Sequence, residues 1–368
     1  MSHPESPAGL GFRMPAEWEP HRATWIGWPH NTSDWPGKFG PIPWVYGEIA
    51  RALVPGELVR ILVNSEDHER KARRVLQQVG VDDGRVEFLR FPTNRGWTRD
   101  FGPMFVRRDK PPPPPGLAIA KFRFNAWAKY PDWKLDNRVA ARAASRLKVR
   151  LFQARVQDRD VVLEGGSIDV NGRGTVLTTE ECLLDREVQA RNPTLQRADI
   201  EHVLKDQLGA TNVLWLGKGI VGDDTHGHVD DVCRFVSPRT VVLCREGDPT
   251  DANYRALEEN RERLAGMRLE DGSKIDVVEL PMPRPVSFDG QRLPASYANF
   301  YIANAAVLVP TFNDPKDPVA LGILGELFKD RPVVGIHAVD LVWGLGTIHC
   351  LTQQEPCLTQ QEPSVGSI

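Results

Sequence analysis

Short apolar runs alternate with amphipathic stretches along this chain of 368 residues. The pattern predicts helices over 48–53, 65–79, 138–147, 198–208, 251–265 and 318–327. It predicts strands over 58–63, 86–91, 104–107, 117–124, 161–163, 175–178, 213–216, 232–236, 240–243, 275–280, 299–302, 306–309 and 333–336, with a hairpin turn at 171–172. Two strands, a helix and a further strand recur several times. We therefore expect an α/β fold built from repeated ββαβ units.

No break in composition divides the chain, and we interpret residues 1–368 as a single domain with a tail at 1–12 and an extension at 357–368. The five prolines of 111–115 can continue neither a helix nor a strand ladder, and they predict a stiff hairpin connection. The extension begins with a duplication, because the seven residues 350–356 (CLTQQEP) occur again as 357–363. Only one of the two copies can occupy one site.

Composition excludes several classes of partner. The 46 basic and 49 acidic residues leave a net charge of −3, so the chain offers no basic field for a nucleic acid. No apolar run approaches the roughly 18 residues of a membrane helix, and residues 1–10 show no signal peptide. The five cysteines are an odd, sparse set, which indicates free thiols. We expect a cytoplasmic protein with no nucleic-acid or membrane partner.

Candidate chemistry lies in four stretches that combine glycine turns with titratable side chains: WTRDFGP (97–103), EGG (164–166), DDTHGHVDD (223–231) and GLGTIHC (344–350). Together they supply a thiol nucleophile, a proton carrier and acidic partners. One reading is a metal centre, because His226, His228 and Asp230 have ligand spacing. A metal centre leaves the glycine-flanked Cys350 unexplained.

The other reading is covalent catalysis by a cysteine on a cationic substrate. An ordinary thiol is only a few per cent ionised at neutral pH, and nearby carboxylates raise its pKa further. Carboxylates can clamp a planar guanidinium in bidentate fashion. A bound cation about 4 Å away contributes roughly 4 kcal/mol at an effective dielectric near 20, or about three pKa units, so the substrate helps to form the thiolate.

Five stretches resemble the agmatine deiminase branch of the guanidine-modifying pentein superfamily: MPAEWEPH (14–21), FNAW (124–127), EECLL (180–184), PASYANFY (294–301) and IHCLTQQ (348–354). The resemblance spans nearly the whole chain. It implies a pentein fold, a five-bladed α/β propeller of ββαβ modules with pseudo-fivefold symmetry around a central pocket.

By the same resemblance, Cys350 is the nucleophile, His228 is the general acid and base, and Glu164 orients His228. Asp100 and Asp230 grip the guanidinium. The remaining implied roles are pocket residues (Trp97 and Asp224), structural histidines (His226 and His349) and buried packing thiols (Cys182, Cys233 and Cys244). The implied reaction converts agmatine to N-carbamoylputrescine and ammonia in polyamine (putrescine) biosynthesis. We expect neither a metal nor an organic cofactor, and a homo-oligomer.

Three alternatives remain open at this stage. Deimination of free arginine would need a cation for its carboxylate, and Arg22, Arg95 and Arg99 are available; a peptidyl-arginine substrate would need an open cleft and, commonly, export. A non-catalytic guanidine- or polyamine-binding module would bind ligand without releasing ammonia. A metal-dependent hydrolase would lose activity with a chelator. The chain also departs from the family in its duplicated tail, and we assign the nucleophile to Cys350 rather than Cys357 because Cys350 keeps the glycine turn and the preceding Ile-His pair.

Overall fold

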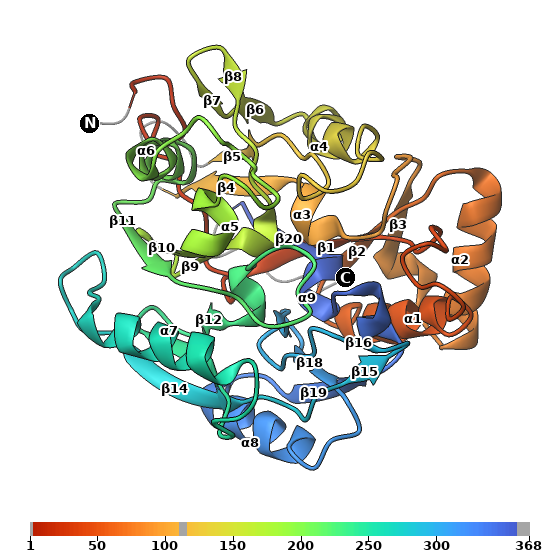
Figure 1. Cartoon of the computed structure of the whole chain (residues 1–368). Helices are drawn as coiled ribbons and strands as arrows, with labels where there is room; N and C mark the ends of the chain where they lie inside the picture. Colours follow the sequence, from red (N-terminus) through yellow and green to blue (C-terminus); the bar gives the residue numbers. More distant parts are fainter. Residues whose placement is uncertain (1–2, 110–115, 359–368) are drawn as a thin grey trace.

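The computed structural model describes residues 3–109 and 116–358, and within these ranges five small sheets surround a common centre (Figure 1). Four of the sheets have the strand orders β4-β5-β6, β9-β10-β11, β12-β13-β14 and β17-β18-β19. In each, the first two strands are antiparallel and the last two are parallel. A helix connects the two parallel strands, because a parallel pair needs a long crossover. These units confirm the predicted ββαβ repeat.

The strands are β1 His21–Gly27, β2 Leu58–Leu62, β3 Val86–Leu89, β4 Met104–Arg108, β5 Gly116–Lys121, β6 Arg150–Gln153, β9 Ile168–Val170, β10 Thr175–Thr179, β11 Asn212–Leu216, β12 Cys233–Phe235, β13 Thr240–Arg245, β14 Asp276–Pro281, β17 Tyr301–Ile302, β18 Val307–Thr311, β19 Val333–His337 and β20 Thr352–Pro356. Two short ribbons pair β7 Arg155–Val156 with β8 Arg159–Asp160, and β15 Ser287–Phe288 with β16 Gln291–Arg292. The α-helices are α1 Ile42–Leu53, α2 Glu66–Gln78, α3 Thr98–Phe101, α4 Val139–Leu147, α5 Glu180–Leu184, α6 Arg197–Leu208, α7 Tyr254–Gly266, α8 Asp317–Leu327 and α9 Ile348–Leu351. The 3₁₀ turns are η1 Asp83–Arg85, η2 Asp136–Arg138, η3 Gly165–Ser167, η4 Val229–Asp231 and η5 Leu341–Gly344.

The fifth sheet, β20-β1-β2-β3, joins the two ends of the chain. Strand β20 is antiparallel to β1, and β1 is parallel to β2, so β20 supplies the strand that the N-terminal module lacks. A buried carboxylate on β20 stabilises the pairing of this strand with the N-terminal module. Glu355 accepts hydrogen bonds from the indole of Trp25 and the guanidinium of Arg60, each at 2.8 Å.

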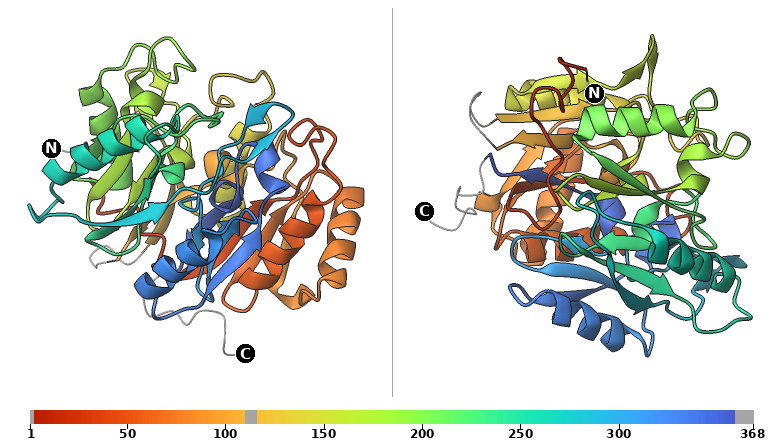
Figure 2. Two further views of the ribbon diagram at one scale, coloured as in Figure 1. Left: turned by 60° about the horizontal axis from the view of Figure 1, so that its bottom comes forward. Right: turned by 90° about the vertical axis from the view of Figure 1, so that its left-hand side faces the viewer.

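The longer helices lie on the outside of the ring (Figures 1 and 2). Helix α2 shows why these helices lie outside: only Ala72 and Leu76 are buried, and most of its other residues are polar. Its first turn is fixed by Ser65, whose side chain accepts a hydrogen bond from the backbone N–H of His68. Among the described residues, the helices are all too short or too polar to cross a membrane.

The inner ends of the modules consist of short turns and short helices, unlike the outer surface with its longer helices. Helices α3 and α9 lie near the centre of the ring (Figure 1), and the turns η3 and η4 join them there. They contact one another across the modules, with α3 lying against both η3 and α9. The four glycine-linked stretches of the sequence contribute to these segments, so the fold brings their titratable side chains to one place.

One predicted strand is wrong. Residues 161–163 make only an isolated bridge, between Val162 and Arg123. The side chain of Asn192 explains the difference, because its amide bonds both the N–H and the C=O of Val162, at 2.9 and 2.8 Å. A side chain here takes the place of a neighbouring strand.

Other local predictions are confirmed. The turn at 171–172 joins the antiparallel strands β9 and β10, and Gly172 adopts a φ of 69°, which favours glycine. Strands β4 and β5 pair as a hairpin up to Arg108 and Gly116, as expected. The prolines of that connection, 111–115, lie outside the described residues. The structure adds strands β1, β6, β9 and β20 and the two short ribbons, which the sequence pattern did not predict.

The closure of the ring can be tested through Arg60. Replacing Arg60 by Ala leaves the Glu355 carboxylate buried without its main cation, and breaking such a pair costs about 3–5 kcal/mol. We expect denaturant unfolding to show a free energy of unfolding lower by about 3 kcal/mol for Arg60→Ala. Arg70→Ala is the control, since Arg70 is an exposed partner of Asp67 and should change stability by less than about 1 kcal/mol. Equal effects of the two changes would contradict this role of Arg60.

Candidate active site

Cys350 lies in α9, at the inner end of the ring, with only 5% of its surface exposed. Its sulfur accepts a hydrogen bond from the side-chain amide of Asn299 at 3.2 Å and lies 3.9 Å from a carboxylate oxygen of Asp230. Burial raises the pKa of the Cys350 thiol well above its usual value, and the charges of Asp230, Asp231 and Asp100 raise it further. Without a ligand, the thiol is therefore protonated at neutral pH.

Asp100, in α3, is a carboxylate that lines the cavity next to Cys350. The Trp127 indole donates to one of its oxygens at 2.9 Å, and the backbone N–H of Gly166 donates to the other at 3.1 Å. Burial raises the pKa of Asp100 to about 6, although the charge of His228 opposes this shift. The carboxylate is thus held in a fixed orientation and is ionised above that pH.

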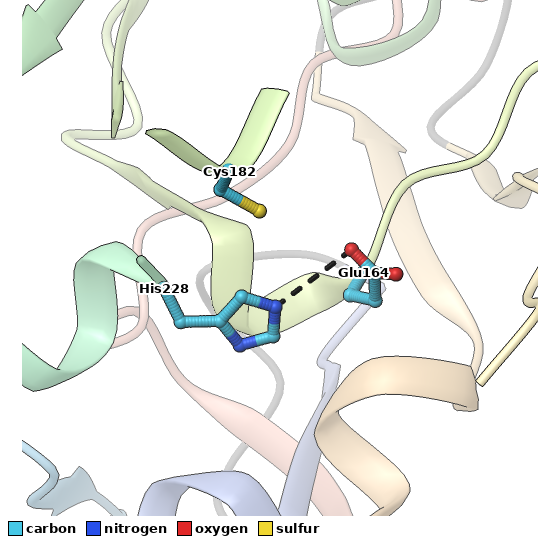
Figure 3. Close-up of side chains that lie close together, drawn as sticks. All are labelled: Glu164, Cys182 and His228. Carbon is cyan, nitrogen blue, oxygen red and sulfur yellow. Dashed lines mark ion pairs between the residues drawn. The ribbon is translucent and has the colours of Figure 1, made fainter. Parts of the chain in front are cut away.

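His228 precedes η4 and is 1% exposed. Its Nδ1 lies 3.8 Å from Asp100 and 4.0 Å from Asp230, and its Nε2 lies 3.7 Å from Glu164 (Figure 3). Burial lowers the pKa of His228, but Asp100, Cys182 and Glu164 together raise it well above its usual value. The ring is therefore an imidazolium in the free protein, ready to donate a proton.

Glu164 remains ionised beside His228. Burial would raise its pKa, but the guanidinium of Arg191, whose Nε donates to it at 3.2 Å, and His228 lower the pKa to about 2. Arg191 itself follows α5 and also donates to the backbone C=O of Thr225 in the loop before His228. This arrangement fixes Glu164 relative to the histidine.

The carboxylate of Asp230 is fixed in place by a hydrogen bond with His349. The Nδ1 of His349 bonds Asp230 at 2.6 Å, and its Nε2 bonds Glu17 at 2.8 Å. Glu17 in turn accepts from Arg99 at 3.1 Å and from Arg234 at 2.9 Å. Burial raises the pKa of Asp230, but its bond to His349 and the charges around it, including Arg234, together lower the pKa below the usual value. Asp230 therefore stays negative while completely buried.

Gly166 allows the backbone to approach this cluster. A Cβ atom at this position would lie 2.5 Å from the His228 ring, 2.9 Å from Asp100 and 3.0 Å from Asp230. Any side chain would fill the space between the two carboxylates. The glycine pair after Glu164 thus serves a steric purpose.

A cavity of about 390 Å³ leads to Cys350 and Asp100. Trp97 and Trp127 form its inner walls, and three carboxylates, Asp34, Asp132 and Asp224, lie along it. Arg95 also lines the cavity, but its guanidinium is paired with Asp34 and Asp132. His228, Glu164 and Asp230 lie one layer deeper, in contact with the cavity through Asp100 and Cys350.

The structure thus brings together the predicted nucleophile, the histidine and the three inner carboxylates, and Trp97 and Asp224 also line the cavity. Sequence reasoning assigned no role to Glu17, Trp127 or Asn299. All three lie in stretches quoted for the resemblance, 14–21, 124–127 and 294–301, which was the available signal. Arg191 was missed altogether.

The metal centre considered from the sequence is not formed. His226 bonds Asp185 at 2.8 Å and is partly exposed, whereas His228 faces Glu164 and Asp100. The two imidazoles of this His-x-His pair point to different partners, because His226 adopts a φ of 62° in a tight turn.

The duplicated tail is described only to 358. Cys357 is buried, and its N–H donates to the C=O of Pro20 at 2.9 Å, next to β1 and away from the cavity.

A ring of ββαβ modules with a buried thiol, an imidazolium and paired carboxylates at its centre defines the class of guanidine-modifying pentein enzymes. The chain belongs to the family of Porphyromonas-type peptidyl-arginine deiminases, whose model matches residues 13–356.

Several relatives are similar over nearly their whole length. The agmatine deiminase of Pseudomonas aeruginosa (strain LESB58) is 37% identical, with 97% of this chain and 99% of that protein covered. The structure of the agmatine deiminase of Enterococcus faecalis superposes with a TM-score of 0.86 at 34% identity, covering 95% of this chain and 97% of the other. A cysteine-to-serine variant of the C. jejuni agmatine deiminase, with substrate bound, has a TM-score of 0.81 at 29% identity, with 94% and 96% covered.

Proposed function

We propose that the protein is an agmatine deiminase, which hydrolyses agmatine to N-carbamoylputrescine and ammonia. The observation that carries this proposal is the buried thiol of Cys350 beside Asp230, at the end of a cavity lined by carboxylates. Such a site disfavours anions and attracts a planar cation. The similarity to agmatine deiminases over the whole chain supports the same substrate.

The first half of the reaction forms a covalent intermediate. A guanidinium bound between Asp100 and Asp230 lowers the pKa of Cys350, whose proton passes to solvent. The thiolate attacks the guanidinium carbon and forms a neutral tetrahedral intermediate. An amide anion is too poor a leaving group, so His228 donates its proton and ammonia departs. An S-alkylthiouronium remains on Cys350.

The second half returns the enzyme to its initial state. His228, now neutral, takes a proton from water, and the hydroxide adds to the thiouronium carbon. Collapse of this second tetrahedral intermediate breaks the C–S bond, and its hydroxyl proton returns to the sulfur. The ureido product is neutral, so it loses the attraction of Asp100 and Asp230 and leaves.

The far end of the cavity favours an amine over a carboxylate. Of the three arginines considered for binding the arginine carboxylate, Arg99 is bonded to Glu17 and Gln354 deep in the core. Arg22 is an exposed residue that does not line the cavity, and Arg95 is occupied by two aspartates. Asp224 also lines the cavity, where one of its oxygens pairs with the exposed Lys129 and the other accepts from Tyr130. We propose that the distal ammonium of agmatine replaces the exposed Lys129 as the partner of Asp224.

The homo-oligomeric state and the cytoplasmic location, the latter expected from the composition of the sequence, remain predictions.

The nucleophile assignment predicts opposite effects of two cysteine changes. Cys350→Ala should abolish ammonia release from agmatine, because it removes the thiol that lies 3.9 Å from Asp230 at the end of the cavity. Cys357→Ala should keep most of the wild-type rate. An assay of ureido product from agmatine, arginine and a blocked arginine ester should detect turnover with agmatine. The reverse pattern of the two variants would refute the assignment, and preference for arginine would refute the proposed substrate.

The role of Asp224 predicts a change in KM. Asp224→Asn should raise the KM for agmatine about fivefold at nearly constant kcat, because a partly exposed ion pair contributes about 1 kcal/mol. The control is Asp67→Asn on α2, an exposed charge far from the cavity, which should leave both constants unchanged. A drop in kcat with constant KM in Asp224→Asn would instead place this carboxylate at the chemical step.

A further inference from the structure

Cys182, in α5, is a buried thiol to which the mechanism above assigns no chemical step. Its sulfur, the imidazole of His228 and the carboxylate of Glu164 offer three ligand atoms that all lie within 4.8 Å of one another. Figure 3 shows the three side chains converging from separate segments. None of them is more than 1% exposed.

Two atoms of this group are unsatisfied. Within the described part of the chain, neither His228 Nε2 nor Glu164 Oε2 has a hydrogen-bond partner, although both are buried. Their separation of 3.7 Å is too long for a hydrogen bond. It is close to the edge of a tetrahedral zinc site, about 3.4 Å for nitrogen and oxygen ligands at their usual distances from the metal. The spacing therefore fits a shared cation better than a direct bond.

The surrounding charges also favour a cation. Asp100 and Asp230 lie 3.8 and 4.0 Å from His228 Nδ1, on the opposite side of the ring from Glu164. Neither distance is a hydrogen bond, and Nδ1 is also without a partner among the described residues, but the two negative charges favour a cation at the ring. Arg191 is the opposing cation, and it occupies the other oxygen of Glu164.

We propose that Cys182, His228 and Glu164 form an inhibitory site for a thiophilic divalent cation such as Zn²⁺. Binding releases one proton from the Cys182 thiol and one from the His228 imidazolium, and the cation takes the thiolate sulfur, Nε2 and Oε2 as ligands. Water fills the fourth position. His228 can then neither donate nor accept a proton, so deimination stops. The inhibition rests on the proposed function, whereas the binding does not.

Isothermal titration with Zn²⁺ tests the binding directly. The full-length Cys350→Ala protein serves as the starting point, because it removes the nucleophile as a competing ligand. We expect one Zn²⁺ per chain, and at least about tenfold weaker binding after the further change Cys182→Ala. Cys244→Ala is the matched control, a second buried thiol that contacts Ser296 and should leave the affinity unchanged. Equal affinity with and without Cys182 would overturn the site.

A second measurement does not depend on whether the Cys182 variant folds. Co²⁺ added to the Cys350→Ala protein should give a thiolate-to-metal charge-transfer band, which requires a cysteine ligand. In a separate assay, agmatine turnover by the wild type should fall as Zn²⁺ is added. Absence of the band would overturn the proposal. Zn²⁺ binding without any deiminase activity in the wild type would retain the site and refute the proposed function, while activity unaffected by bound Zn²⁺ would refute the inhibition.

Discussion

The structure depends on keeping carboxylates charged inside a dry core. Asp230, Asp100 and Glu164 point toward one small volume, where their mutual repulsion and their loss of hydration would each favour protonation. A second layer of buried partners compensates. His349 forms hydrogen bonds with both Asp230 and Glu17, and Glu17 also pairs with the guanidinium groups of Arg99 and Arg234. The residues of this network come from separate parts of the chain, around 17, 99–100, 164, 230–234 and 349, so the ring must close before the site exists.

This arrangement explains how a thiol with a raised pKa can serve as a nucleophile. The carboxylates that bind a guanidinium are the same groups that suppress the Cys350 thiolate, so reactivity appears only when a cation occupies the site. Two consequences follow. Neutral and anionic molecules find a protonated, unreactive sulfur, and the neutral ureido product is released because it no longer compensates the carboxylates. Selectivity and turnover thus have one electrostatic origin.

Much of the fold was predictable because each ββαβ unit carries its own local pattern of short strands and an amphipathic helix. The pattern did not predict strands whose pairing partner lies far away in the sequence. It also predicted a strand wrongly where a side chain takes the place of the partner strand. Strand β20 pairs with β1, some 330 residues distant, and the pairing of 161–163 is taken over by Asn192. In the site, glycine turns and titratable residues indicated Asp100, Glu164, His228 and Cys350. Glu17 and Arg191 act through buried pairs, which no local spacing reveals.

The central claim is that Cys350 is protonated until a cation binds. The most direct measurement is the pH dependence of Cys350 alkylation by iodoacetamide in ligand-free protein, with the modified residue identified by mass spectrometry and Cys350→Ala as the background. The rate should rise about tenfold per pH unit up to pH 9 without levelling, because the thiolate fraction is small throughout. A plateau reached with a midpoint below about pH 7.5 would show a preformed thiolate and contradict the account.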